Sequence, residues 1–410
     1  MQQVNRPVLV IAVIAVGIAG LVAFSADWKF WQRYMTQPKT AEGLSVSWFQ
    51  PQETVAGAYR PLETVADGPG QYALDDALEI AEEYDSDALL VALDGKIIAE
   101  SYWNGATSET KLLTFSFHKT ISALLVGLAI EDGYIAGADV PLGDLIPEWE
   151  GDPRGQVKLR DAMRMSGGFS HPDNARGPFS SAARFKFSSD IEKRTLEATL
   201  SAQPQPAFDY GERPAQIVGM ALQNALPVPY GQYLSNRLWA PIGASEAAIT
   251  FSRKGGQAIT YCCLMANARD WLRIGLLLEG KGTIDGRRVI SQNWLEQMTE
   301  SSPTNPNFGL FIWRGDPHSA ARSYTPAVPA VVRSAAPFAV DDVIFLDGAG
   351  GQRIYVSPSL NLVIVRIGAY RPDWDDTKLF NSIAGAISRP IGSAPGGTVR
   401  RINPAKELTQ

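Results

Sequence analysis

The chain has 410 residues, of which 45% are hydrophobic and 20% charged, and its formal net charge is −6. This composition provides enough apolar residues for a large core and excludes overall disorder. No basic block occurs, so nucleic acid is not an expected partner. The two cysteines, Cys262 and Cys263, are adjacent in an apolar run. Neighbouring cysteines provide neither a disulfide framework nor a zinc site, so we expect buried packing for both and no metal.

The first predicted element is an apolar segment near the N-terminus. Pro7 to Ala26 contains no charged residue, and about 20 apolar residues span a membrane, whereas the core of a cleaved signal has roughly 7–15. Length favours an uncleaved membrane anchor, and Ala23-Phe24-Ser25 leaves a cleaved secretory signal as the alternative. Either way we expect the rest of the chain outside the cytoplasm, in the periplasm or the extracellular space.

Composition divides the chain further. We expect residues 1–27 to be the anchor or signal, and residues 28–70, rich in Trp, Gln, Pro and Thr, to be a juxtamembrane arm and linker. Residues 71–392 form the expected globular domain, and residues 393–410 a C-terminal tail.

Helix and hairpin signals follow in the globular domain. Leu74 to Tyr84 has apolar residues at helical spacing, and two β-rich runs, 88–93 and 96–102, flank Asp94-Gly95, which predicts a hairpin. A buried helix is predicted from Ile121, with Gly133 able to end it. Further helices are expected at 217–226 and 268–278, and a small hairpin at 282–290.

Strand patterns return at the C-terminal end, at 343–346, 353–356 and 362–367, before a closing helix at 378–387. Strands at both ends with helices between them predict an α+β fold. In this fold one antiparallel sheet, built from the N- and C-terminal segments, is flanked by helices and carries an inserted helical lobe.

The clearest chemical signal lies at the start of the helix that begins near Ile121. Ser116 precedes the helix and Lys119 lies one turn further on, facing the same way. The helix dipole favours the anion that forms when a hydroxyl attacks, and an ammonium one turn away can exchange a proton with that hydroxyl. This S-x-x-K spacing is typical of penicillin-recognising serine enzymes. The alternative is an N-cap serine followed by a solvated lysine.

Two downstream segments have the order that such an enzyme needs. Tyr210 precedes a predicted helix and could act as a general base if nearby lysine charge lowers its pKa. The run from Asp347 to Gln352 contains three glycines before a strand. Such glycines could let a substrate lie against that strand, with a backbone N–H after them facing an oxyanion. The alternatives are a packing tyrosine and an ordinary tight turn.

Together these stretches resemble the class C β-lactamase-related serine hydrolases, a superfamily that includes carboxylesterases and 6-aminohexanoate-dimer hydrolases. The resemblance covers roughly residues 74–388 and rests on Ser116-x-x-Lys119, Met165-Ser166-Gly167-Gly168, Tyr210 and the run 350–358. That last run is especially similar to the aminohexanoate-hydrolase branch. The resemblance implies a β-lactamase/transpeptidase-like fold.

The family's roles, carried over, make Ser116 the acylated nucleophile, Lys119 its proton partner and Tyr210 the general base and acid. The backbone N–H groups of Ser116 and Gln352 would form the oxyanion hole. Glu212, Gly350 and Gly351 would contact substrate, and no cofactor is implied. The expected activity is hydrolysis of a small ester or amide through an acyl-enzyme.

The chain departs from the family pattern at two places. Glu212 stands where the family has an amide donor, and Ala349-Gly350-Gly351 replaces the Lys-Thr-Gly of true β-lactamases. Two alternatives therefore stay open: a β-lactamase or DD-peptidase acting on the cell wall, and a catalytically silent member that binds peptidoglycan or a partner.

Several aromatic and histidine residues allow two interpretations. His118 lies two positions from Ser116 on the helix, so packing is favoured over a catalytic triad. His171 could line the rim of the cleft or lie in a solvated loop. Trp103, Phe308 and Trp313 could form an aromatic substrate wall or belong to the core.

Overall fold

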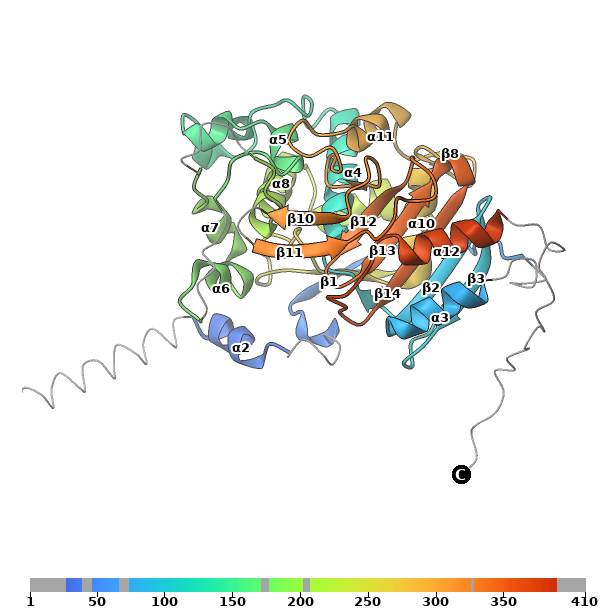
Figure 1. The fold of residues 1–410 in the computed structure, drawn as a ribbon. Helices are drawn as coiled ribbons and strands as arrows, with labels where there is room; N and C mark the ends of the chain where they lie inside the picture. Colours follow the sequence, from blue (N-terminus) through green and yellow to red (C-terminus); the bar gives the residue numbers. More distant parts are fainter. Residues whose placement is uncertain are drawn as a thin grey trace, which may run out of the picture.

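The computed structural model describes residues 27–38, 46–65, 74–170, 177–201, 207–325 and 328–388. Figure 1 shows a twisted sheet with helices on both faces and a helical lobe to one side.

The central sheet joins the two ends of the described chain. It has six strands, each antiparallel to its neighbours. In spatial order they are β3 (Lys96–Tyr102), β2 (Ser86–Leu93), β14 (Leu362–Gly368), β13 (Gln352–Ser357), β12 (Ile344–Gly348) and β9 (Trp313–Arg314). β2 pairs with β14 from Leu93 opposite Leu362 to Ala88 opposite Ile367. The predicted α+β fold with a sheet from both termini is therefore confirmed.

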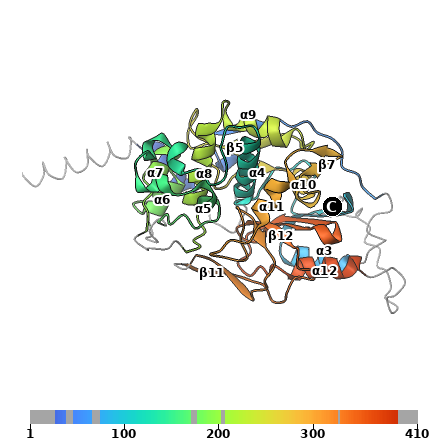
Figure 2. The same cartoon turned by 90° about the horizontal axis from the view of Figure 1, so that it is seen from above.

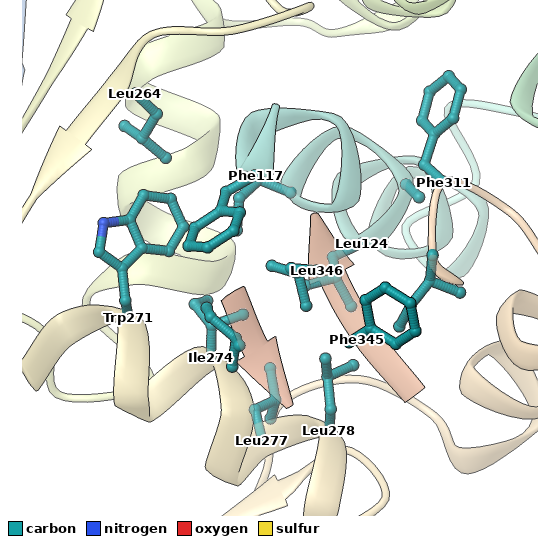
Figure 3. Packing of buried hydrophobic residues seen from close by; sticks show 14 of the residues in the cluster. Phe117, Leu124, Leu264, Trp271, Ile274, Leu277, Leu278, Phe311, Phe345 and Leu346 are labelled. Atoms are coloured by element: carbon teal, nitrogen blue, oxygen red, sulfur yellow. The ribbon is translucent and has the colours of Figure 1, made fainter. Parts of the chain in front are cut away.

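Helices cover both faces of this sheet. α3 (Asp75–Glu83) and α12 (Lys378–Ile387) lie on one face, and α4 (Phe117–Glu131) and α10 (Ala268–Glu279) on the other (Figures 1 and 2). Figure 3 shows the second interface, where Phe117 and Leu124 of α4, Trp271 and Ile274 of α10, and Leu346 of β12 converge. All five side chains are fully buried.

The helix that follows Ser116 is buried on every side. Each residue from Phe117 to Ala129 is buried, including four polar side chains in its first two turns. Gly127 is needed because a Cβ there would lie 2.2 Å from the indole ring of Trp294. The chain leaves the helix at Gly133, whose φ is +80°. The core thus fixes the helix N-terminus in place.

The inserted lobe contains short helices and a second sheet. Its helices are α5 (Leu159–Met163), α6 (Ser181–Lys186), α7 (Ile191–Leu196), α8 (Glu212–Ala225) and α9 (Tyr230–Leu234). The four-stranded sheet has the order β1 (Gln52–Val55), β5 (Ala247–Thr250), β6 (Leu264–Ala266), β4 (Leu112–Leu113). The remaining elements are α11 (Gln292–Thr299), the hairpin β7 (Thr283–Ile284) and β8 (Arg287–Arg288), and the ribbon β10 (Ala321–Thr325) and β11 (Val328–Arg333).

The N-terminal arm is part of the folded body. Its helix α2 (Trp28–Thr36) buries Phe30 against Phe187, and β1 extends the second sheet by pairing with β5. Arg33 donates hydrogen bonds to the carbonyl oxygens of Gln50 and Ser252. The sequence did not predict these contacts, because the arm has weak periodicity and its partners lie far along the chain.

The membrane-anchored placement expected from the sequence is corrected here. Among the helices of residues 27–388 that the structure describes, none is long and apolar enough to cross a membrane. The segment from Pro7 to Ala26, on which that expectation rested, lies outside the described residues, as does the tail at 393–410. Membrane anchoring and a location outside the cytoplasm are therefore unsupported.

A buried ion network links the strands of the C-terminal half. Arg353 bridges Asp347 and Asp376, with 2.7 Å between its Nη2 and Oδ1 of Asp376. Arg322 on β10 bridges the same carboxylates, at 2.8 Å to Asp347 and 2.6 Å to Asp376. None of the four side chains is more than 8% exposed. Two arginines and two aspartates therefore balance their charges away from water.

We expect Asp376→Ala to destabilise the fold strongly, because it leaves two buried guanidinium groups short of one carboxylate. Removing one partner of a buried ion pair costs about 3–5 kcal/mol. Asp373→Ala, which removes only an exposed pair with Arg371, should cost less than about 1 kcal/mol. Urea unfolding of both variants measures the difference. Equal stabilities would contradict the role given to the network.

Candidate active site

Ser116 occupies a sharp turn at the N-terminus of α4. Phe115, just before it, has φ +50°, a conformation uncommon for a residue with a side chain. The carbonyl oxygen of Phe115 accepts a hydrogen bond from the N–H of Cys263 at 3.3 Å. Non-glycine residues in this region concentrate at functional sites, where the surrounding structure stabilises them. The turn leaves Ser116 partly exposed at the positive end of the α4 dipole.

Lys119 lies one turn along α4 and is directed at Ser116. Its Nζ donates a hydrogen bond of 2.7 Å to Oγ of Ser116 and another of 2.9 Å to the carbonyl oxygen of Tyr261. The side chain is only 2% exposed. Burial lowers the pKa of Lys119 to about 8, although the charges of Glu212 and Asp347 act in the opposite direction. A substantial fraction of this lysine is therefore neutral near pH 8, and a neutral amine can accept a proton from the serine.

Tyr210 completes the group. It lies two residues before the start of α8 at Glu212, and Nζ of Lys119 lies 4.8 Å from the centre of its ring. Its backbone N–H donates to the carbonyl oxygen of Tyr324 at 2.8 Å. The structure thus brings Ser116, Lys119 and Tyr210 together from two helices far apart in the sequence.

The electrostatic state of Tyr210 differs from the one expected. Burial and the nearby carboxylate of Asp347 raise the pKa of Tyr210 well above its ordinary value. The sequence expectation was a pKa lowered by lysine charge, but the loss of hydration outweighs any such effect. Tyr210 therefore carries its proton at neutral pH, and in this resting state Lys119 is the better proton acceptor.

A cavity of about 870 Å³ opens beside Ser116. Its walls carry apolar and aromatic side chains, among them Trp48, Phe49, Phe115, Phe185, Tyr261 and Tyr370. Of the two interpretations given for Phe308 and Trp313, the structure supports the core: both are buried and contact the ring of Tyr210. Trp103 is half-buried and packs against the same core. Part of the real wall comes from the N-terminal arm, which no local motif indicated.

Charged groups of both signs line the same cavity. Glu212, the first residue of α8, lies on the wall together with Lys186. Burial lowers the pKa of Lys186, and the opposite charge of Glu212 partly offsets this. Asp85 and Asp87 lie at another part of the wall, joined by the side-chain amide of Asn104 at 3.0 and 3.1 Å. The cavity therefore carries charged groups of both signs.

The glycine turn between β12 and β13 has a structural explanation. Gly350 and Gly351 have φ of +77° and +90°, and a Cβ on either would collide with Tyr370 or Trp374. These two aromatic rings therefore fill the space into which a side chain at either position would extend. The turn requires glycine for its left-handed backbone and for close packing.

Gln352 is not among the residues that line the cavity. Its side chain is fully buried. Nε2 of Gln352 donates to the carbonyl oxygen of Gly368 at 2.9 Å, and Oε1 accepts from the N–H of Gly368 at 2.8 Å. Its backbone pairs with Gly348 across the hairpin. Ala349, by contrast, lines the cavity together with Ser116. The end of β12 can approach the segment before Ser116 closely because Gly348 has no side chain. A Cβ at Gly348 would lie 2.3 Å from the carbonyl oxygen of Thr114.

The histidines take no direct part in this group. His118 is fully buried, with Nδ1 2.9 Å from the carbonyl oxygen of Cys262 and Nε2 2.9 Å from the hydroxyl of Tyr230. Burial lowers the pKa of His118 to about 4, so the ring is neutral at physiological pH. His171 lies outside the described residues.

The cysteines differ from the sequence prediction. Cys262 and Cys263 form a disulfide between neighbouring residues, and both line the cavity. Cys263 has φ +72°, a local conformation that sequence spacing does not reveal. No cluster of three or more potential metal ligands occurs in the described part of the chain.

Comparisons with known proteins place the chain in a family. The β-lactamase family model matches residues 74–379. The 6-aminohexanoate-dimer hydrolase of Paenarthrobacter ureafaciens is 24% identical over 335 residues, which cover 78% of this chain and 81% of that protein.

Two solved structures share the fold. A Bacillus anthracis protein provisionally described as a 6-aminohexanoate-dimer hydrolase has a TM-score of 0.66 at 17% identity, with 84% of this chain and 91% of that chain covered. A class C β-lactamase from Rhodobacter sphaeroides has a TM-score of 0.56, also at 17% identity, over 77% of this chain and 98% of that chain. The match of the family model over three quarters of the chain shows that this protein belongs to the β-lactamase family of serine hydrolases.

Proposed function

We propose that this protein hydrolyses a small ester or amide through an acyl-enzyme intermediate on Ser116. The observation that carries the proposal is the 2.7 Å hydrogen bond between Nζ of the buried Lys119 and Oγ of Ser116 at a helix N-terminus. A nucleophile bonded to a base whose pKa is lowered is the arrangement that covalent catalysis needs. The bond also requires both side chains to share one face of α4, as the S-x-x-K spacing indicates.

In the acylation step, neutral Lys119 takes the proton of Ser116 while Oγ attacks the carbonyl carbon. The substrate oxygen becomes an oxyanion, and we assign its donors to the backbone N–H groups of Ser116 and Ala349, because both residues border the cavity. Tyr210, which holds its proton, donates it to the leaving alkoxide or amine and regains a proton from Lys119. Water then attacks the acyl-enzyme with the same groups acting in reverse.

The mixed lining of the cavity supports a small, largely apolar acyl or leaving group. Glu212 and Lys186 both lie on the wall, so the cavity carries charges of both signs beside its apolar side chains. Uncharged esters need only the nucleophile and the oxyanion donors. A carboxylated β-lactam would meet Glu212 and finds no lysine in the Ala349–Gly351 turn, which is an unfavourable pairing.

The decisive experiment is labelling with a fluorophosphonate probe followed by peptide mapping, which should place the label on Ser116. Ser116→Ala should abolish labelling and ester hydrolysis. Lys119→Ala and Tyr210→Phe should each lower kcat by about two orders of magnitude or more, the scale of a lost acid–base group. Ser122→Ala, another buried serine of α4, is the matched control and should retain activity. Full activity of a folded Ser116→Ala variant would remove the basis of the proposal and favour a silent, binding-only protein.

The pH dependence should follow Lys119. Because the neutral amine is the active form, kcat/KM should rise with pH through about 8, the pKa to which burial lowers Lys119. Glu212 stabilises the ammonium, so Glu212→Gln should move this limb to lower pH, whereas Glu82→Gln on the distant α3 should leave it in place. If the pH at which kcat/KM rises is unchanged in Glu212→Gln, a group other than Lys119 controls the rise.

Substrate preference separates the esterase from a β-lactamase. Short-chain p-nitrophenyl esters should be hydrolysed measurably, and a chromogenic cephalosporin should be turned over at least about 100-fold less efficiently, since discrimination of roughly 3 kcal/mol corresponds to this factor. Efficient cephalosporin hydrolysis would favour the β-lactamase alternative instead.

A further inference from the structure

The disulfide between Cys262 and Cys263 lies in the segment that supports the proposed catalytic residues. Three consecutive residues hold three positions around Ser116. The carbonyl oxygen of Tyr261 accepts the hydrogen bond of Lys119 at 2.9 Å. The carbonyl oxygen of Cys262 lies 2.9 Å from Nδ1 of His118, and the N–H of Cys263 donates to Phe115 at 3.3 Å.

The conformation of this segment depends on the two cysteines. Cys263 has φ +72°, a region that a residue with a side chain occupies at a cost of roughly 1–2 kcal/mol. The disulfide closes a small ring that contains the peptide bond between the two residues, and it restricts the backbone of both. Opening the ring removes this restriction, so the chain gains conformations in which the three contacts are lost.

The disulfide is also within reach of small molecules. Cys262 is half-buried and Cys263 is buried, and both line the cavity of about 870 Å³ that opens beside Ser116. A thiol that enters the cavity can therefore approach Sγ of Cys262 from the side on which substrate would bind.

We propose that the Cys262–Cys263 disulfide is a redox-sensitive positioning element, which keeps the Tyr261 carbonyl on Lys119 when oxidised and releases it when reduced. This inference rests on the proposed function of Ser116 and Lys119. In the reduction, a thiolate attacks Sγ of Cys262, the S–S bond breaks, and Cys263 leaves as a thiolate that takes a proton from water. A second thiol attacks the mixed disulfide and frees Cys262. Two thiols are thereby oxidised to one disulfide, which balances the two electrons gained by the protein.

The test compares the full-length oxidised protein with the same protein treated with dithiothreitol. Iodoacetamide should label Cys262 and Cys263 only after reduction. Reduction should lower kcat for a p-nitrophenyl ester by roughly tenfold or more, because Nζ of Lys119 is then no longer held in position against Oγ of Ser116. Reoxidation should restore the rate. The double variant Cys262→Ser/Cys263→Ser should show the low rate and no response to dithiothreitol, which excludes effects of the reductant elsewhere.

The pH profile distinguishes positioning from general loosening. The Tyr261 carbonyl stabilises the ammonium form of Lys119, so its loss should move the alkaline rise of kcat/KM to lower pH in the reduced protein. A merely loosened structure would lower the rate without moving this limb. Unchanged rates and an unchanged limb after complete reduction would overturn the inference. Alkylation of both cysteines in the air-oxidised protein without reductant would overturn it as well.

Amide hydrogen exchange keeps the two proposals separable. If the oxidised protein neither hydrolyses esters nor reacts with a fluorophosphonate, the proposed function fails. The positioning claim is then decided by exchange in peptides that contain Phe115 to Lys119 and Tyr261 to Cys263. Faster exchange there after reduction supports it, and unchanged exchange contradicts it.

Discussion

The site depends on the removal of one lysine from water. Lys119 is 2% exposed, and an ammonium group in such surroundings loses most of its hydration, which shifts its equilibrium toward the neutral amine. The protein limits this effect with two oxygen acceptors, from Ser116 and Tyr261, and with the more distant charges of Glu212 and Asp347. The resulting pKa of about 8 lies close to that of an effective base at physiological pH.

The carboxylate of Asp347 is paired with two arginine side chains. Asp347 accepts ion pairs from Arg353 and Arg322 and a 2.6 Å hydrogen bond from the hydroxyl of Tyr324. These partners compensate the negative charge of Asp347. An unpaired carboxylate at this place would hold Lys119 in its charged form and raise the pKa of Tyr210 still further, because it acts on both. The ion network therefore links the C-terminal strands. It also reduces the negative charge that Asp347 exerts on Lys119 and Tyr210.

Local patterns were sufficient to predict the elements that carry the chemistry. The Asp94-Gly95 hairpin, the buried helix after Ser116 and the C-terminal strands all have a strong local signal, and the structure has them at nearly the expected bounds. Strand patterns at both ends of the chain predicted one shared antiparallel sheet, but not that β2 would pair with β14. Ser116, Lys119 and Tyr210 meet because the first two share a helix face, and the third lies just before a helix that packs beside it.

Features that depend on distant contacts could not be predicted in this way. Gly350 and Gly351 are explained by Tyr370 and Trp374, which approach from a later loop. The conformation of Cys263 depends on Phe115, almost 150 residues earlier in the chain, and on its own disulfide. The pKa of Tyr210 was expected to fall because only the charge of a neighbouring lysine was considered. Burial, which reverses the direction, arises from packing that no motif encodes.

The cavity is lined both by residues of the segment that matches the family model and by residues that precede it. Ser116 and Ala349 belong to the segment that matches the family model, residues 74–379, but Arg33, Trp48 and Phe49 on the opposite wall precede that segment. Arg33 holds this wall in place through the carbonyl oxygens of Gln50 and Ser252. Under the proposed function, the reacting atoms are thus supplied by the shared fold, whereas part of the surface that touches substrate comes from an arm outside it. Loops and extensions tolerate substitution more readily than a packed core does. An arm in this position allows substrate preference to change while the buried lysine and its partners stay as they are.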